Sequence, residues 1–208
     1  MGRHSAFDKG ASLMAWTNRN IFLGQQRRWV GAPGSLSARL AAAGQKFSVQ
    51  VLNQGMQKLR ADEAQALGWS EPRVGYVREV LLRVDGAAVV FARSVTAQSQ
   101  SLGPWRSIRG LGTRPLADVL FKRVGIVRAP LQFSRLQAAN PVNRHVARAW
   151  KAGSGEAAVP RALPTRRSVF RRRGAPMLVM EVFAADQKPW CWPGSRSRSV
   201  KLRPRTQS

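Results

Sequence analysis

The fold of this chain follows from residues 74–95, VGYVREVLLRVDGAAVVFARSV. The stretch contains two runs rich in β-branched and aromatic residues, which favour strands. Between them stands Asp85-Gly86, a dipeptide typical of a tight turn between antiparallel strands. Residues 74–83 and 88–95 are therefore predicted to pair as a β-hairpin.

Other segments predict strands of the same kind. Residues 46–51 alternate between apolar and polar side chains, the pattern of a half-buried strand. One more strand is predicted over residues 124–133. Residues 165–172 and 176–183 read as two strands joined by an Arg-Gly turn. In total, the sequence predicts about six strands.

Short helices are predicted between these strands. Ser35, Thr113 and Asn140 are placed to start three of them, at about residues 33–44, after residue 113, and at 140–153. A further short helix is expected over 105–111, whereas residues 61–72 read as a polar connection. Because the helices do not alternate regularly with the strands, the pattern predicts an α+β fold, with an antiparallel sheet and helices on one face.

The 208 residues suit a single domain. Weak periodicity makes residues 1–28 an N-terminal extension, and the domain is expected to span 29–185. Residues 186–208 are rich in Pro, Ser and Arg, a composition typical of a disordered tail. An insertion is expected over residues 138–161.

The formal net charge of +25 points first at a polyanion such as nucleic acid. The basic residues are, however, spread along the chain, and they are densest in residues 122–185. No zinc-finger spacing, RNP-like aromatic signature or KH-type loop occurs. The charge therefore leaves three interpretations: a basic surface with no specific role, a field that attracts small dianions, or nucleic-acid binding.

Cysteine and hydropathy indicate the cell compartment. Cys191 is the only cysteine, so no intramolecular disulfide can form, which fits a reducing cytoplasm. Residues 7–23 are too polar for a signal peptide. No run approaches the roughly 20 apolar residues of a membrane helix. A cytoplasmic protein without a membrane span is expected.

Two charges fall within apolar strands. Side chains alternate across a sheet, so Arg78 shares a face with Val80, and Glu181 shares a face with Val179 and Phe183. Buried charges are costly unless they are paired.

Arg78 and Glu181 could therefore pair with each other, or one of them could face solvent at a sheet edge. The functional alternative is a ligand pocket inside the fold. There the planar fork of Arg78 would hold a carboxylate, and Glu181 would act as an acid or hydrogen-bond partner. Burial would favour a protonated Glu181 that can donate.

Other chemistries have little support. The only histidines are His4 and His145, which argues against a histidine triad or a multi-histidine zinc site. Cys191 lies in the expected tail and is not expected to act as a nucleophile. No glycine-rich nucleotide motif occurs. The run 171–173 of three arginines reads as a solvated strand end or, alternatively, a binding patch.

Four blocks in order resemble the chorismate pyruvate-lyase (chorismate lyase) family. They are YVREVLL at 76–82, LGTRPL at 111–116, RRSVF at 166–170 and MLVMEVF at 177–183. SLSARL at 35–40 matches more loosely, and Ala117 stands where Gly is common. The resemblance covers roughly residues 29–185.

The resemblance implies a monomer with a six-stranded antiparallel sheet and helical flaps that enclose the ligand. It implies elimination of pyruvate from chorismate to give 4-hydroxybenzoate for ubiquinone biosynthesis, with no cofactor and no metal. Arg78 matches the residue that binds the ring carboxylate, and Glu181 the acidic residue near the 4-hydroxyl. Leu36 and Leu116 match positions that contact the ligand mainly through backbone groups.

Two rival functions remain open from the sequence. One is a non-catalytic ligand-binding module, because the same fold resembles effector domains of some bacterial transcription regulators. Residues 1–28 are too few to hold the DNA-binding domain that usually precedes such modules. The other is a basic nucleic-acid-binding protein that uses residues 122–185 and the tail.

Overall fold

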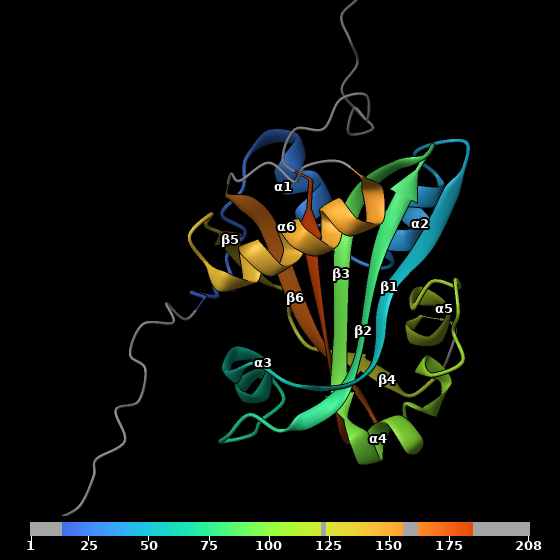
Figure 1. Ribbon diagram of the computed structural model, residues 1–208, viewed down its shortest axis with the longest axis vertical. Coiled ribbons are helices and arrows are strands. Elements are labelled where there is room, and N and C mark those ends of the chain that lie inside the picture. Colours follow the sequence, from blue (N-terminus) through green and yellow to red (C-terminus); the bar gives the residue numbers. More distant parts are fainter. Residues whose placement is uncertain (1–13, 122–123, 156–161, 185–208) are drawn as a thin grey trace, which may run out of the picture.

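A single antiparallel sheet forms the centre of the protein, as a computed structural model shows (Figure 1). The structure describes residues 14–121, 124–155 and 162–184. The strands run in the order β1-β2-β3-β7-β6-β4, and β5 also pairs with β6. Their bounds are Phe47–Lys58 (β1), Val74–Val84 (β2), Ala87–Ala97 (β3), Ile126–Arg128 (β4), Gln132–Leu136 (β5), Leu163–Arg172 (β6) and Ala175–Phe183 (β7). The predicted α+β class is confirmed.

The hairpin β2–β3 lies where the sequence predicts it. Asp85 and Gly86 both have positive φ angles, 49° and 84°, as a turn of two residues between twisted strands requires. The Asp85 carboxylate also accepts hydrogen bonds from the backbone N–H groups of Gln45 and Lys46, at 2.9 and 2.7 Å. The turn is thereby tied to the start of β1.

The structure has seven strands where six were expected. The strand predicted over residues 124–133 is two short strands, β4 and β5, and both pair with β6. Pro130 stands between them. Proline has no N–H group to donate to the neighbouring strand, so the ladder is interrupted there.

Seven short helices accompany the sheet in the described part of the chain. Their bounds are Gly24–Val30 (α1), Leu36–Ala41 (α2), Ala61–Ala66 (α3), Gln98–Leu102 (α4), the 3₁₀ helix Arg106–Ile108 (η1), Ala117–Leu120 (α5) and Pro141–Ser154 (α6). The predicted caps Ser35 and Asn140 each accept a hydrogen bond from a backbone N–H group at the helix start. None of the described helices has the length and apolar character that crossing a membrane requires.

Helices α5 and α3 differ from expectation, and α4 was not predicted. The helix expected after Thr113 begins only at Ala117, and α3 occupies part of the polar connection. In α3 the Glu63 side chain accepts a hydrogen bond from the backbone N–H of Arg60 at 2.9 Å. Such a cap can start a helix too short to show a hydrophobic period.

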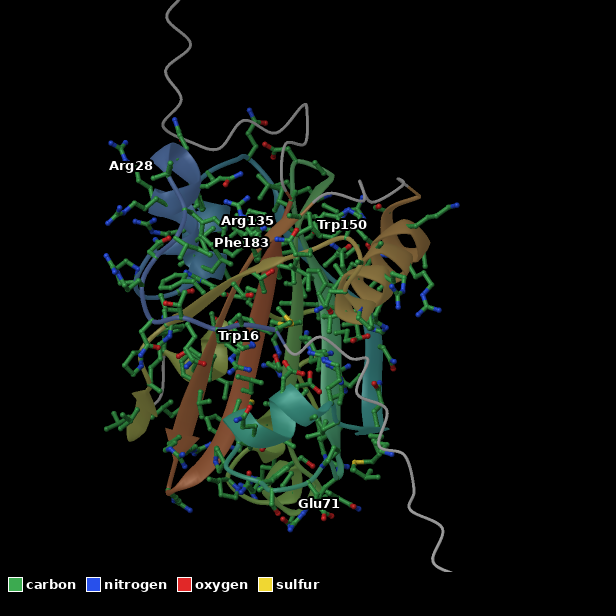
Figure 2. The ribbon with its side chains drawn as sticks, turned by 90° about the vertical axis from the view of Figure 1, so that its left-hand side faces the viewer. Trp16, Arg28, Glu71, Arg135, Trp150 and Phe183 are labelled. Atoms are coloured by element: carbon green, nitrogen blue, oxygen red, sulfur yellow. The ribbon has the colours of Figure 1, made fainter. Side chains whose placement is uncertain are left out.

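Helices cover both faces of the sheet, whereas one covered face was expected. Val146 and Trp150 of α6 pack against Leu81 and Phe91 on one face. Helices α1, α2, η1 and α5 contribute to the clusters on the other face. Figure 1 shows α6 lying across the sheet, and Figure 2 shows α1 and α6 on opposite sides of it. We call the α6 side the outer face and the other side the cavity face.

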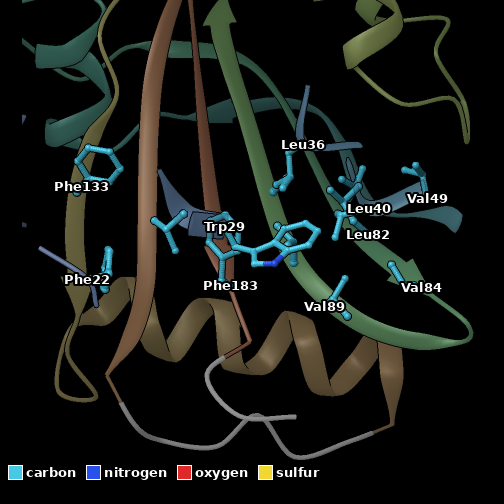
Figure 3. Packing of buried hydrophobic residues seen from close by; sticks show 14 residues of the cluster. Phe22, Trp29, Leu36, Leu40, Val49, Leu82, Val84, Val89, Phe133 and Phe183 are labelled. Atoms are coloured by element: carbon cyan, nitrogen blue, oxygen red, sulfur yellow. The ribbon is translucent and has the colours of Figure 1, made fainter. Parts of the chain in front are cut away.

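The described residues before 29 pack against the domain. Thr17 forms a β-bridge with Phe133, and Phe22 is fully buried. Trp29 of α1 lies in the middle of the cluster that also contains Phe183 (Figure 3). The expected tail and residues 156–161 of the expected insertion lie outside the described residues, as do His4 and Cys191.

Candidate active site

A cavity lies between the sheet and the two helices α2 and α5. Strands β1, β2, β3, β6 and β7 contribute its floor, and α2 and α5 contribute its cover. Its lining residues are Gly34, Leu36, Ser37, Val49, Arg78, Val80, Leu82, Ala92, Ser94, Leu116, Ala117, Leu120, Phe121, Arg128, Arg166, Phe170, Val179 and Glu181. The four residues predicted from the sequence, Arg78, Glu181, Leu36 and Leu116, all belong to this lining.

Arg78 is only 2% exposed. One terminal nitrogen donates to the backbone carbonyl oxygens of Gly112 and Arg114, at 2.8 and 3.2 Å. Its Nε is buried and has no hydrogen-bond partner among the described residues. Burial lowers the pKa of Arg78, and the nearby Tyr76 opposes that shift. The side chain is thus held by one nitrogen and keeps donors for a ligand.

Glu181 pairs with Arg166, not with Arg78. The Arg166 Nε donates to Glu181 Oε2 at 2.5 Å, and its NH1 group donates to the carbonyl oxygens of Val30 and Ala32. Glu181 is 16% exposed, so it is partly buried as predicted. An Arg78–Glu181 ion pair does not form in the described structure.

The strand register explains this pairing. Arg78 lies opposite Ser94 of β3, whereas Glu181 lies opposite Ala92. The two charges therefore sit in different rows of the sheet, on opposite sides of the central strand β3. In β6, by contrast, Arg166 is the direct neighbour of Glu181.

The Glu181 carboxyl group uses only one of its two oxygens on Arg166. Only Oε2 accepts from Arg166, and Oε1 has no hydrogen bond within the described residues. Glu181 is therefore an acceptor in the cavity lining with one oxygen that is not used by Arg166.

Leu36 and Leu116 come from the helices that cover the cavity. Leu36 is the first residue of α2, and Leu116 is the N-cap of α5. Backbone N–H groups at a helix start lack partners within the helix. Both leucines therefore contribute an apolar wall at the start of a covering helix.

Sequence reasoning missed two arginines of the cavity. Arg166 shares a face of β6 with Ser168 and Phe170, so alternation could have placed it there. Arg128 gave no comparable signal, because β4 has only three residues and the predicted strand ran through Pro130.

A second charge cluster lies on the outer face. Arg93 donates to Glu63 and to Glu79, each at 2.7 Å, and all three side chains are less than 5% exposed. His145 Nε2 lies 2.7 Å from the same Glu79 oxygen. Arg167 lies 3.7 Å from Asp62. We call this group the outer-face cluster.

The cavity carries three arginines and one glutamate, so it favours anions. No group of three or more His, Cys, Asp or Glu side chains that could hold a metal occurs in the described residues. Fold and site together define an α+β protein with a cavity under two short helices whose charged lining is mostly basic.

Comparison with known proteins identifies the family. The family described as "Chorismate lyase" matches residues 12–191. A relative from Albidiferax ferrireducens named "Probable chorismate pyruvate-lyase" is 65% identical over 186 residues, which are 89% of this chain and 94% of that protein. A relative of the same name from Cupriavidus metallidurans is 44% identical over 161 residues, 77% of this chain and 73% of that protein. The chain belongs to the chorismate lyase family.

A solved structure shares the fold. The PhnF C-terminal domain superposes with a TM-score of 0.50 at 19% identity, and the match covers 74% of this chain and 89% of that domain. The likeness concerns the antiparallel sheet and its helices.

Proposed function

We propose that this chain is a monomeric, cytoplasmic chorismate pyruvate-lyase that supplies 4-hydroxybenzoate for ubiquinone biosynthesis. The observation that carries the proposal is the pair of unsatisfied groups in one cavity. Among the residues that the structure describes, Arg78 Nε is a buried donor without a partner, and Glu181 Oε1 is an acceptor without one. In a member of this family, Arg78 can bind the carboxylate of a hydroxylated ring acid, and Glu181 can bind its hydroxyl group.

Arg78 binds the ring carboxylate in this proposal. Its contacts to Gly112 and Arg114 fix the guanidinium plane before the substrate arrives. A planar fork that is already oriented loses little entropy when it binds a carboxylate. The hydrogen bonds are charge-assisted and lie in a largely buried place, where they are strong.

Glu181 acts at the hydroxyl-bearing end of the ring. In the reaction, the ring carbon that bears the hydroxyl loses a proton, and the neighbouring C–O bond to the enolpyruvyl group breaks. The electron pair of the C–H bond completes the aromatic ring, and the departing enolpyruvate takes up a proton and becomes pyruvate. As a carboxylate held by Arg166, Glu181 is suited to bind the hydroxyl and to receive the ring proton.

Leu36 and Leu116 close the cavity over the ring. Their apolar side chains exclude water, and the backbone N–H groups near the two helix starts add donors for the bound anion. The enzyme's own contribution is orientation and exclusion of water, because aromatisation of the substrate drives the reaction.

The test is incubation of the purified full-length chain with chorismate alone. Equal amounts of 4-hydroxybenzoate and pyruvate are expected. Formation of 3-hydroxybenzoate would mean that the cavity binds chorismate but that the enzyme catalyses a different reaction. Binding of 4-hydroxybenzoate with no turnover of chorismate would contradict the lyase activity and favour the ligand-binding module.

A further inference from the structure

Two arginines of the cavity share an unusual feature. Arg78 and Arg128 both have a buried Nε without a hydrogen-bond partner in the described residues. Arg166, the third arginine of the lining, uses its Nε on Glu181 and its NH1 on two backbone carbonyls. The cavity thus contains one occupied guanidinium and two that keep donors available.

The Arg128 side chain is held in place from two sides. Arg128 is the last residue of β4, and its guanidinium carbon lies 5.2 Å from the centre of the Phe170 ring. Its NH1 donates to the carbonyl oxygen of Gly34, just before α2, at 3.3 Å. Phe170 also contacts Phe121 of the cover, edge to face at 6.0 Å. These contacts orient the guanidinium without neutralising its charge.

Within the described part of the chain, no carboxylate forms an ion pair with Arg128. Burial lowers its pKa, the neighbouring Arg166 lowers it further, and Glu181 opposes the shift. Glu181 offsets this charge only in part, because its Oε2 accepts the short bond from Arg166. A partly buried cation that is not paired with a carboxylate is costly, and binding an anion removes that cost.

We propose that Arg128 binds the second carboxylate of chorismate, the one on the enolpyruvyl group, while Arg78 binds the ring carboxylate. The assignment rests on the proposed function, and it explains why one cavity has two guanidiniums with free donors. Chorismate has two carboxylates, whereas 4-hydroxybenzoate has one. Arg128 therefore distinguishes substrate from aromatic product, and Arg78 does not.

The test compares Arg128→Gln with Arg78→Gln in the full-length chain. For Arg128→Gln, the KM for chorismate is expected to rise at least about tenfold, because a charge-assisted contact is lost. Its Kd for 4-hydroxybenzoate, measured by calorimetry, is expected to stay within about threefold of wild type. Arg78→Gln should weaken both ligands. Arg128→Lys should recover part of the chorismate affinity, because it restores the charge but not the fork.

The matched control is Arg135→Gln. Arg135 lies 5.2 Å above the Phe22 ring and does not line the cavity, so this variant loses the same charge and the same kind of ring contact. Its KM and Kd should match wild type, which separates a local contact from the general basic field. If Arg128→Gln does not fold, Arg128→Lys tests the assignment through a smaller loss, which should again affect chorismate and spare 4-hydroxybenzoate.

Two results would overturn the assignment. One is an unchanged KM for chorismate in Arg128→Gln, and the other is an equal loss of chorismate and 4-hydroxybenzoate affinity. Failure of the proposed function would look different, because the wild-type chain would then release no 4-hydroxybenzoate.

Discussion

The two faces of the sheet use buried charge in opposite ways. On the outer face, Arg93 is bonded to Glu63 and Glu79, so each buried charge has a charged partner. On the cavity face, Arg78 bonds only backbone carbonyls of the described residues, and its buried Nε has no partner among them. Both arginines are almost fully buried, at 4% and 2% exposure.

The difference teaches that burial of a charge does not by itself mark a site. The cavity face differs because some of its charged groups have hydrogen-bonding atoms that no described residue uses. A cluster whose charges satisfy one another holds the fold together, whereas a charge that is fixed in place but unsatisfied is available to a ligand. The predictions below test this division.

Replacing Arg93 should have the largest effect on stability. Arg93→Met leaves Glu63 and Glu79 buried without their shared cation, so the free energy of unfolding should fall by about 3–5 kcal/mol. Urea denaturation measures the loss. Arg135→Met, on the surface, serves as the control and should change stability by about 0.5 kcal/mol or less. A similar loss of unfolding free energy in both variants would show that the outer-face cluster does not specifically stabilise the fold.

Replacing Arg78 should show the reverse pattern. In Arg78→Gln, kcat/KM for chorismate should fall more than tenfold, which corresponds to more than about 1.4 kcal/mol of transition-state stabilisation. The free energy of unfolding should change by only about 1 kcal/mol, the net contribution of a typical hydrogen bond. A folded Arg78→Gln with wild-type turnover would refute the assignment of the site.

Acid should destabilise the protein through the outer-face cluster. Burial raises the pKa of Glu63, but the hydrogen bond from Arg93 and the charges of Arg60 and Arg93 outweigh it and lower the pKa below its usual 4.5. In Glu79, the bond from His145 and the charge of Arg93 likewise outweigh burial. The unfolded chain therefore binds more protons in this range, and stability should fall as the pH drops below about 4.5.

The melting temperature measured between pH 7 and pH 3 checks this dependence. Glu63→Gln removes one of the two groups, so its melting temperature should be lower at pH 7 and should depend less steeply on pH. A curve parallel to wild type would show that the acid sensitivity arises elsewhere.

The smallest effect is expected at Leu36. Leu36→Met keeps the side-chain volume and the backbone, and such exchanges are usually tolerated in packed sites. Its kcat/KM should stay within about twofold of wild type. A loss above tenfold would mean that the branched side chain, and not the backbone, contacts the ligand.

Much of this comparison could be predicted from the strands alone. Alternation placed Arg78 and Glu181 on inward faces, and Asp85-Gly86 located the hairpin that carries Arg78. These are local properties, because one strand determines which side chains share a face.

The partners of those charges could not be predicted. The Arg166–Glu181 pair depends on the register between β6 and β7, and the Arg93–Glu63 pair depends on α3 folding back over the sheet. The position of Arg128 depends on the break at Pro130. Each of these contacts is set by tertiary packing, which no single segment encodes.

The most direct test is a crystal structure of the chain with 4-hydroxybenzoate bound. The ligand is expected in the cavity, with its carboxylate within hydrogen-bond distance of Arg78 and its hydroxyl beside Glu181. A ligand bound at the outer-face cluster, or one bound in the cavity with no contact to Arg78, would contradict the assignment.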